Sequence, residues 1–506
     1  MQSGGRVDRG SVVVVGLCVL FTLALRVPFL TWPLMPDEAG LLIIAQHWEE
    51  GPFLYGDYFV GRGVVLMLLY SLADALGGAL ALRLLACLVV AVLVIAAGWA
   101  GHCLRGRSGA TWAALVAASY GSTYAFSASV MNGRLVAATL VLVSCACTIA
   151  AVRHPNPWSR TPDALAVLAG TAATCALLVV QSYAGGIAFA GTLLLVSWRS
   201  RGLSGRAATR IAGVGVLGML LPVLALGTAV LVSWPTAEQV WFQMFGYRLA
   251  AADVIVASSE RPMERFAELA VLGGITGVFL LGLCFLLNVR LVKYRESAPV
   301  WAGVLAMLLF ASAGMVLGGA WYPDYMLQLV PALVLGTALV APQPSWSGIG
   351  MRAGASLAAV AAVVATYMGL ERPMLGTPTN EAAVGRWLAA DAAPGDTAVV
   401  LWGKANVLHE AGMTTPYPYL WSLLTRTLDP DLDLLRATLV GPEAPTWIVE
   451  WYDLNSWELD ESGDLAEIVN DRYRFVGRPC GVDVYLLRSE SRSLPPSAQC
   501  REIEDR

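Results

Sequence analysis

The sequence is poor in charged residues, which fill only 14% of its 506 positions. A soluble globular domain carries roughly 25%, so this composition excludes a chain that is soluble throughout. Hydrophobic residues make up 57% of the chain, and the mean hydropathy is +0.62. Apolar runs recur over the first 370 residues, many of them close to the about 20 residues that cross a bilayer as a helix. The sequence therefore predicts a polytopic α-helical membrane protein.

Histidine is scarce and cysteine is unpatterned, which argues against the common metal motifs. The four histidines are scattered at 47, 102, 154 and 409, so no histidine metal site is expected. Seven of the nine cysteines lie in or beside apolar runs, where cysteine is a small core residue. Cys480 and Cys500 lie in the polar tail, where they form a disulfide if that tail is exported and remain thiols if it is not. No basic patch indicates a nucleic-acid partner.

Eleven apolar stretches are predicted to span the membrane. The first follows Arg6 and Arg9 and is interpreted as an uncleaved signal anchor. The fifth and sixth are short and separated by residues 181–186, an arrangement typical of an interrupted hairpin that lines a cavity. The stretch Val64 to Leu76 is too short to span and is predicted to be an interfacial helix. The spans lie near 11–30, 81–101, 109–128, 131–151, 163–180, 186–198, 209–233, 266–289, 299–318, 324–341 and 351–370.

The basic residues set the predicted orientation in the cytoplasmic membrane. With eleven spans and the N-terminus inside, the cytoplasmic segments hold 14 of the 21 Lys and Arg residues before position 371, as the positive-inside rule requires. Counting Val64 to Leu76 as a span would move Arg105 and Arg107 outside. The fourteen are Arg6, Arg9, Arg105, Arg107, Arg153, Arg160, Arg199, Arg201, Arg206, Arg210, Arg290, Lys293, Arg295 and Arg352.

Residues 371–506 differ from the membrane part, residues 1–370, and are predicted to form a separate extracytoplasmic domain. They hold 12 Lys and Arg against 22 Asp and Glu. Strand-like runs at 397–402, 446–451, 473–476 and 482–487 alternate with helical stretches near 381–390, 429–438 and 463–471, which is typical of a small α/β domain. Its aromatic residues Trp421, Trp451 and Tyr452 are expected to be core.

The polar loop from Thr31 to Arg62 carries the sharpest chemical signal. It contains the adjacent carboxylates Asp37 and Glu38, and charges beside a membrane span are costly to desolvate unless they have a function. Outside the cell an activated sugar must arrive on a lipid, because nucleotide donors are absent there. Transfer from a prenyl-phosphate sugar needs a carboxylate to deprotonate the acceptor hydroxyl and cations to hold the phosphate. Arg62, Arg134 and Arg248 are candidates for those cations.

The run Met35-Pro-Asp-Glu-Ala39, followed by Gly51-Pro-Phe-Leu-Tyr-Gly-Asp57 and Arg62, resembles the first outer loop of GT-C membrane glycosyltransferases. More narrowly, it is similar to the superfamily of protein O-mannosyltransferases and lipid A aminoarabinose transferases, especially its actinobacterial members. Ala81-Leu82-Arg83 and Tyr322-Pro-Asp-Tyr325 with Pro331 match further parts of that pattern. Where the family often has a lysine, at the end of the fifth span, this chain has Gln181.

The resemblance implies a GT-C fold and an inverting transfer from a polyprenyl-phosphate sugar to a cell-envelope glycan, lipid or protein. Asp37 would activate the acceptor, with Glu38 as its catalytic partner, and Arg62 and Arg134 would contact the donor phosphate. The other expected substrate-binding residues are Tyr55, Asp57, Asn132, Gln181, Tyr183, Tyr247, Arg248, Tyr322, Asp324 and Tyr325.

Plainer interpretations stay open from the residues alone. Asp37 is also a good helix-starting residue after Pro36, and the arginines could reach lipid headgroups. Trp241, Phe242, Phe245 and Tyr247 are consistent with an interfacial aromatic belt or with a lid. No cofactor is required, although Asp37, Glu38 and Asp57 could hold a divalent ion. The alternative functions are a non-catalytic subunit that binds polyprenyl lipid and a membrane transporter.

Overall fold

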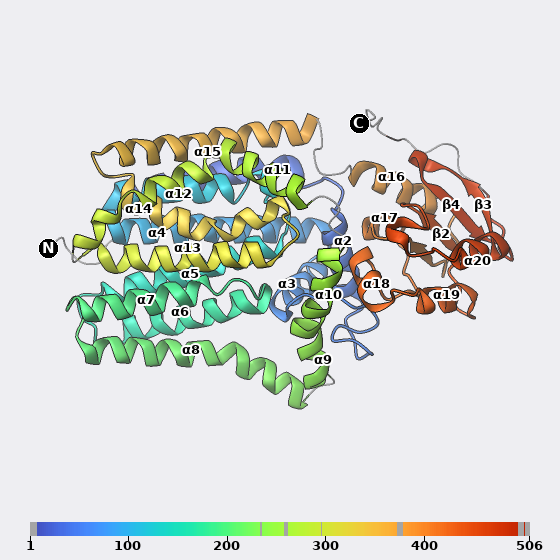
Figure 1. The fold of residues 1–506 in the computed structure, drawn as a ribbon, viewed down its shortest axis with the longest axis horizontal. Helices are drawn as coiled ribbons and strands as arrows, with labels where there is room; N and C mark the ends of the chain where they lie inside the picture. Colours follow the sequence, from blue (N-terminus) through green and yellow to red (C-terminus); the bar gives the residue numbers. More distant parts are fainter. Residues whose placement is uncertain are drawn as a thin grey trace.

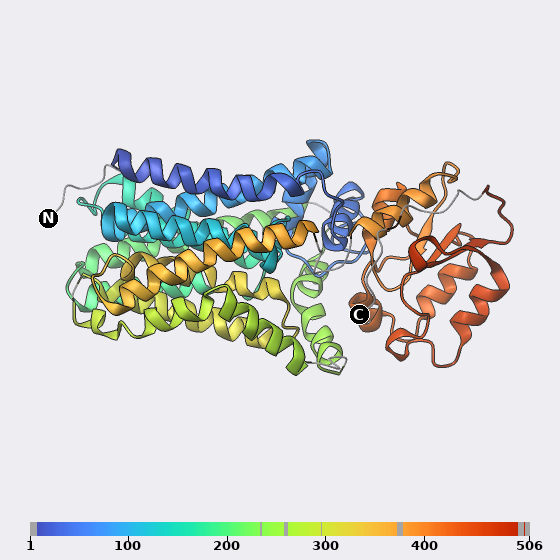
Figure 2. The same ribbon diagram turned by 90° about the horizontal axis from the view of Figure 1, so that it is seen from above.

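The computed structural model describes residues 8–232, 235–257, 262–294, 296–371, 378–493 and 500. They form a long bundle of helices with a smaller domain at one end (Figure 1). The first helix begins at the opposite end of the bundle, as the view from above shows (Figure 2). The bundle helices are α1 (Arg9–Arg26), α4 (Ala79–Tyr120), α5 (Gly133–Val152), α6 (Arg160–Val179), α7 (Gly185–Arg199), α8 (Gly205–Val232), α11 (Pro262–Ile275), α12 (Val278–Leu286), α13 (Ala298–Leu317), α14 (Val330–Val340) and α15 (Trp346–Glu371).

Helix α4 is 42 residues long but folds back on itself. Its backbone is non-helical at Arg105 and at Gly106, where φ is +61°. A side chain at Gly101 would meet the backbone of Gly109, and one at Gly121 would meet Leu93. Residues on either side of the break therefore face each other in antiparallel order. The two halves correspond to the predicted spans 81–101 and 109–128.

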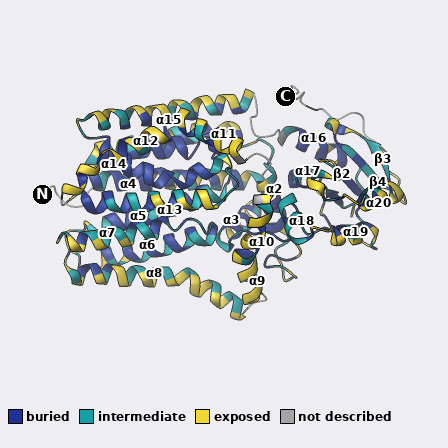
Figure 3. Cartoon of the chain, in the orientation of Figure 1, coloured by how far each residue is buried: buried dark blue, intermediate teal, exposed yellow. Residues whose placement is uncertain are grey.

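Seven of the described helices are long and apolar enough to cross a membrane, or eight if α11 and α12, which meet at a bend of 72°, are one span. Each of the eleven predicted spans coincides with a helix, a helix pair or half of α4, although α7 and α14 are shorter than a full span. The chain is thus a polytopic helical protein, and the number eleven remains a prediction. In the most apolar stretch of α8 only 6% of the residues are buried, as a lipid-facing helix requires (Figure 3).

Several predicted cytoplasmic residues meet at the end of the bundle where α1 begins. Arg105 Nη2 donates to Ser297 Oγ at 2.9 Å, and Arg153 donates to the Glu296 carbonyl at 3.5 Å. The smaller domain lies at the far end, which is the arrangement expected when the two ends face opposite sides of a membrane (Figure 1). Which end is inside remains a prediction. Arg6 and Arg295 lie outside the described residues.

Short elements cover the end of the bundle that faces the smaller domain. The first outer loop contains α2 (Pro36–Gln46) and α3 (Val64–Ala75), the second of which is the helix predicted over 64–76. A second group consists of α9 (Ala237–Trp241), the π-helical turn η3 (Phe242–Gly246) and α10 (Tyr247–Ala257). The 3-10 helix η5 (Pro323–Gln328) precedes α14.

The smaller domain is an α/β unit, as the alternation of runs predicted. Its sheet has the order β1-β2-β4-β3, with β1 (Ala398–Val400) parallel to β2 (Trp447–Glu450). Strands β3 (Tyr473–Gly477) and β4 (Asp483–Leu487) are antiparallel to each other, and β4 is antiparallel to β2. Its helices are α16 (Pro378–Ala389), α17 (Ala405–Ala411), α18 (Ser422–Leu428), α19 (Asp433–Val440) and α20 (Asp464–Arg472).

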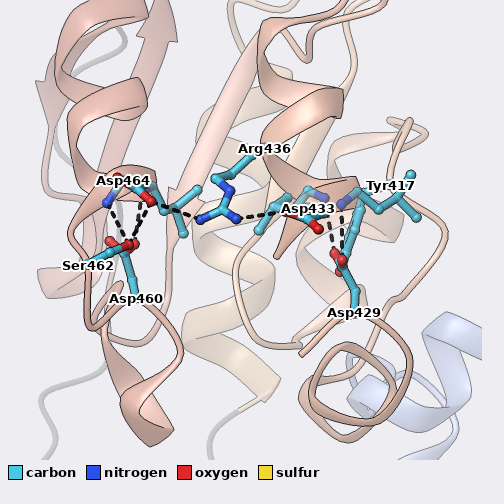
Figure 4. A network of polar contacts seen from close by, with 10 residues as sticks. Tyr417, Asp429, Asp433, Arg436, Asp460, Ser462 and Asp464 are labelled. Carbon is cyan, nitrogen blue, oxygen red and sulfur yellow. Dashed lines mark hydrogen bonds and ion pairs between the residues drawn. The ribbon is translucent and has the colours of Figure 1, made fainter. Parts of the chain in front are cut away.

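Two aspartates cap neighbouring helices of this domain (Figure 4). Asp429 accepts from two backbone N–H groups in the first turn of α19, both at 3.0 Å, and Asp460 does the same for α20. Such caps satisfy donors that have no partner inside a helix. Arg436 on α19 then joins the two helices, since it binds Asp433 at 2.8 Å and Asp464 at 3.2 Å. These acidic residues are thereby accounted for as structural.

The tail cysteines are bonded to each other. Cys480 and Cys500 form a disulfide across a sequence separation of 20, which confirms the pairing considered for an exported tail. Tyr452, in contrast, was expected to be core, and this expectation is wrong: its side chain is 41% exposed, because it follows β2 in a surface loop.

Candidate active site

Asp37 and Glu38 begin α2, and the fold separates their roles. Pro36 occupies the first helical position, where its fixed φ suits a helix start, and both acids lie in the first turn, where the helix dipole favours negative charge. The Asp37 side chain is 62% exposed and lies 3.2 Å from Arg62 Nη2. Glu38 is 1% exposed. One carboxylate of the pair therefore faces solvent and the other faces the protein interior.

Glu38 was predicted to be the catalytic partner of Asp37, and its carboxylate is enclosed by protein. Oε2 lies 2.8 Å from Nη2 of Arg83, which is itself 2% exposed. Oε1 accepts from the Met131 N–H at 2.8 Å, and Oε2 accepts from the Met35 N–H at 3.2 Å. Arg83 also donates to the Pro33 carbonyl. Glu38 thus fastens the start of α2 to α4 and to the loop before α5.

A hydrogen bond to its backbone carbonyl holds Arg62 beside Asp37. The hydroxyl of the fully buried Tyr55 donates to the Arg62 carbonyl at 2.8 Å, so Tyr55 supports the loop from beneath. Asp57 is exposed on the same loop. In the part of the chain that the structure describes, no group of three His, Cys, Asp or Glu side chains could hold a metal ion. Asp37, Glu38 and Asp57 accordingly do not form the divalent site considered from the sequence.

A second polar group joins α5 to η5. Asn132 caps α5 by accepting from the Arg134 N–H at 2.8 Å. Arg134 Nε lies 3.0 Å from Asp324, and its guanidinium stacks 3.5 Å from the centre of the Tyr325 ring. Tyr322 lies edge-on to Tyr325 at 6.2 Å. Arg134 and Asn132 are thereby brought together with Tyr322, Asp324 and Tyr325, which lie roughly 190 positions later in the chain.

Arg248 connects these two groups. Its Nη2 donates to the Gly61 carbonyl at 3.0 Å, next to Arg62, and Arg248 lies exposed in the first turn of α10. Surrounding protein, together with the positive charges of Arg62 and Arg134, lowers the pKa of Arg248 to about 10. Arg248 therefore stays protonated at neutral pH. The positive charges of Arg62 and Arg134 thus act on Arg248, although the three arginines come from distant segments of the chain.

Tyr247 does not line this region with its ring. The ring is buried against Phe59, with 5.2 Å between centroids, and packs over Gly61, where no larger residue would fit. Tyr183 is also buried, beside Arg134. Gln181 donates to the Met244 carbonyl at 2.8 Å. These three predicted residues support the site through packing and hydrogen bonds.

Two glutamines that were not predicted from the sequence bind the group of α9, η3 and α10 to the first outer loop. Gln243 is 1% exposed; it accepts from the Leu54 N–H at 3.0 Å and donates to the Val60 carbonyl at 2.9 Å. Gln239 donates to the Pro52 carbonyl at 3.1 Å and closes a capping box with Thr236. The Thr236-x-x-Gln239 spacing is the one available sequence signal. Trp241, Phe242 and Phe245 remain exposed, as either a belt or a lid requires.

The smaller domain contacts the helix that carries Asp37. Asn406 Nδ2 on α17 donates to the Leu34 carbonyl at 3.2 Å and also binds the buried carboxylate of Glu381, which pairs with Lys404. Trp421 packs directly over Gly40 of α2. Phe59 and Tyr247 share an apolar cluster with Leu424 of α18. The site is therefore built at the joint between the bundle and the smaller domain.

Neither a protein-family model nor a curated protein sequence matches the chain. Solved structures do match it. ArnT from Cupriavidus metallidurans bound to undecaprenyl phosphate is 15% identical, with a TM-score of 0.61 over 94% of this chain and 97% of that one. The Archaeoglobus fulgidus oligosaccharyltransferase in the apo form is 14% identical, with a TM-score of 0.51 over 80% of this chain and 64% of that one. The chain thus has the GT-C fold of these membrane glycosyltransferases, as its first outer loop predicted.

Proposed function

We propose that this protein transfers a sugar from a polyprenyl-phosphate donor to an acceptor in the cell envelope, on the outer side of the membrane. The observation that carries the proposal is the grouping of Asp37 with Arg62, Arg134 and Arg248 at one end of a GT-C bundle. A solvent-facing carboxylate beside several cations provides both a base and a phosphate-binding group. The undecaprenyl phosphate bound to the similar ArnT structure supports a lipid-linked donor.

In the proposed reaction Asp37 accepts the proton of the acceptor hydroxyl. The hydroxyl oxygen bonds to the anomeric carbon while the bond from that carbon to the phosphate oxygen breaks. The electron pair leaves with the polyprenyl phosphate, whose charge Arg62, Arg134 and Arg248 hold. One displacement inverts the configuration at the anomeric carbon. Arg62 lies 3.2 Å from Asp37, so a phosphate that it binds would be held beside the base.

Two assignments are refined by the geometry. Glu38 is a positioning residue in this scheme, because its enclosed carboxylate orients the turn that presents Asp37. Gln181 replaces the lysine often found in similar enzymes, and its amide binds the Met244 carbonyl. Arg248 lies one helical turn after Met244 and supplies a cation to the same region.

The test is a donor screen on the purified protein in nanodiscs. Labelled mannosyl-, arabinosyl- and glucosyl-prenyl phosphates are offered with an envelope extract to the wild type and to Asp37→Asn. We expect transfer by the wild type and a loss of at least about 100-fold in Asp37→Asn, the usual contribution of a general base. Glu50→Gln, which removes an exposed carboxylate of the same loop, is the matched control. Full activity of Asp37→Asn contradicts the mechanism.

The two alternatives give different results in the same experiment. A non-catalytic subunit binds prenyl phosphate without turnover, and a transporter moves a solute without consuming any donor. Direct measurement of released polyprenyl phosphate separates both from a transferase.

A further inference from the structure

The loop after β2 displays two aromatic side chains beside the active-site joint. Tyr452 is 41% exposed and Trp457 is 40% exposed, and their rings meet edge to face at 5.6 Å. Single exposed hydrophobic side chains are common on proteins, whereas adjoining ones that form a patch indicate a binding surface. The two rings therefore present an apolar surface that the folded domain does not itself cover.

The backbone of this loop adopts an unfavourable conformation at Trp457 and at the residue after it. Trp457 and Glu458 have φ values of +59° and +60°, the left-handed region that residues other than glycine rarely adopt. Successive residues of this kind persist only when the surroundings enforce them, and they concentrate at binding sites. Here Trp402 Nε1 donates to the Asp453 carbonyl at 2.9 Å, and the Asn455 side chain accepts from the Asp460 N–H at 2.9 Å. The loop is thus fixed by its neighbours.

Arg426 links the two rings to the arginine region. Its guanidinium lies 5.2 Å from the centre of the Trp457 ring. Arg426 belongs to α18, and α18 shares the apolar cluster with Tyr247 and α10. A ligand held on Trp457 would therefore lie beside α18, the helix of the smaller domain that packs against the membrane part.

The charges around the rings favour ligands with hydroxyl groups over anionic ligands. Asp453 and Glu458 are exposed beside Tyr452 and Trp457, and carboxylates accept hydrogen bonds from hydroxyl groups. The same negative charges disfavour the anionic headgroups of a membrane surface. An apolar ring face flanked by hydrogen-bond acceptors complements a sugar ring, which has an apolar C–H face and a rim of hydroxyl groups.

We infer that Tyr452, Trp457 and Arg426 form a binding site for a saccharide of the acceptor, so that the acceptor is a glycan. This inference rests on the proposed function, because it names the substrate class that the same enzyme would elongate. The sugar ring stacks on Trp457, Tyr452 borders it, and Asp453 and Glu458 accept from its hydroxyl groups.

A binding experiment tests the inference without requiring turnover. Saturation-transfer difference NMR on the full chain in nanodiscs uses linear hexasaccharides of mannose, arabinofuranose and glucose as probes. We expect the wild type to bind at least one probe, and Trp457→Ala and Tyr452→Ala each to weaken that binding on the order of tenfold, as loss of a central aromatic contact does. Phe475→Ala is the control, since Phe475 is a 55% exposed aromatic residue of β3. Equal binding by Trp457→Ala, or no binding of any probe by the wild type, overturns the inference.

The transfer assay distinguishes this inference from the proposed function. With a glycan acceptor, Trp457→Ala raises the KM for the acceptor and leaves the KM for the donor unchanged. If the wild type releases no polyprenyl phosphate, the proposed function fails while the binding result still stands. Transfer to a protein acceptor with an unchanged KM in Trp457→Ala contradicts the glycan assignment alone.

Discussion

Asn406 of the smaller domain donates a hydrogen bond to the backbone carbonyl of Leu34, three residues before Asp37. Asn406 is fully buried, and its amide also contacts Glu381. The position of the proposed base thus depends on a side chain that enters from another domain nearly 370 residues later in the sequence.

Replacing Asn406 with leucine should therefore lower the rate of transfer. The change leaves the Leu34 carbonyl without its donor in a buried place, at about 1–3 kcal/mol. We expect a lower kcat with little change in the KM for the donor, together with a lower Tm. Asn470→Ala, an exposed asparagine on α20, should change neither quantity. An unchanged kcat in Asn406→Leu would show that the joint does not position Asp37.

Breaking the Glu38–Arg83 pair should destabilise the fold more than it alters substrate binding. Removal of one partner from a buried ion pair costs about 3–5 kcal/mol, because the other charge is left uncompensated. Glu38→Gln should accordingly lower the Tm, and Glu38→Gln combined with Arg83→Met should recover part of the loss. Thermal unfolding of the four forms in one detergent measures the coupling. Additive losses would contradict the pairing.

Arg134→Lys should not restore what Arg134→Ala removes. Arginine at this position stacks on Tyr325 and binds Asp324, and a lysine ammonium has neither the planar face nor the forked donors for both contacts. We expect the KM for the donor to rise by roughly 5- to 150-fold in both variants, which corresponds to about 1–3 kcal/mol. Arg199→Ala, an exposed arginine in the last turn of α7, is the control. Wild-type donor affinity in Arg134→Lys would show that charge alone suffices.

Protonation of His409 in mild acid should destabilise the joint between the bundle and the smaller domain. Burial lowers the pKa of His409 below its ordinary value of 6.5, and its Nδ1 has no partner among the described residues. The folded state therefore binds fewer protons than the unfolded state, so stability is retained above about pH 6.5 and is lost as the pH falls below it. We expect the Tm of the wild type to fall more between pH 8 and pH 5 than that of His409→Gln. Parallel curves would exclude this histidine.

The disulfide offers a test of the predicted orientation. Cys480→Ser should destabilise the smaller domain by about 3 kcal/mol, the value expected for a loop of roughly 20 residues. In intact cells, a membrane-impermeant thiol reagent should label Cys480 and Cys500 only after treatment with an impermeant reductant. Cys147, which is buried in α5, should stay unlabelled. Labelling that requires cell lysis would place the domain inside.

The sequence predicted the helical bundle, the strands of the tail and the segments that carry Asp37, Arg62 and Arg134. Those features follow from long apolar runs and from local residue types, which a single sequence displays. The burial of Glu38 could not be predicted, because its partner Arg83 lies 45 residues away and nothing local distinguishes Glu38 from Asp37. The short helices α17 and α18 were missed, since seven residues give too little periodicity to detect.

The other features that were not predicted depend on tertiary contacts. Tyr452 and Trp457 are exposed because a surface loop carries them, and the positive φ value at Trp457 has no sequence signature. Gln239 and Gln243 were overlooked because their partners are backbone groups of another loop.

The contact between Gly40 and Trp421 constrains how the two domains can change in sequence during evolution. A Cβ atom at position 40 would overlap the Trp421 ring, so a larger residue there is tolerated only if position 421 becomes smaller. Homologues should show compensating changes at these two sites, which lie in different domains. An exchange of the smaller domain between distant homologues would then fail unless α2 were exchanged with it, and the two parts must diverge as a single unit.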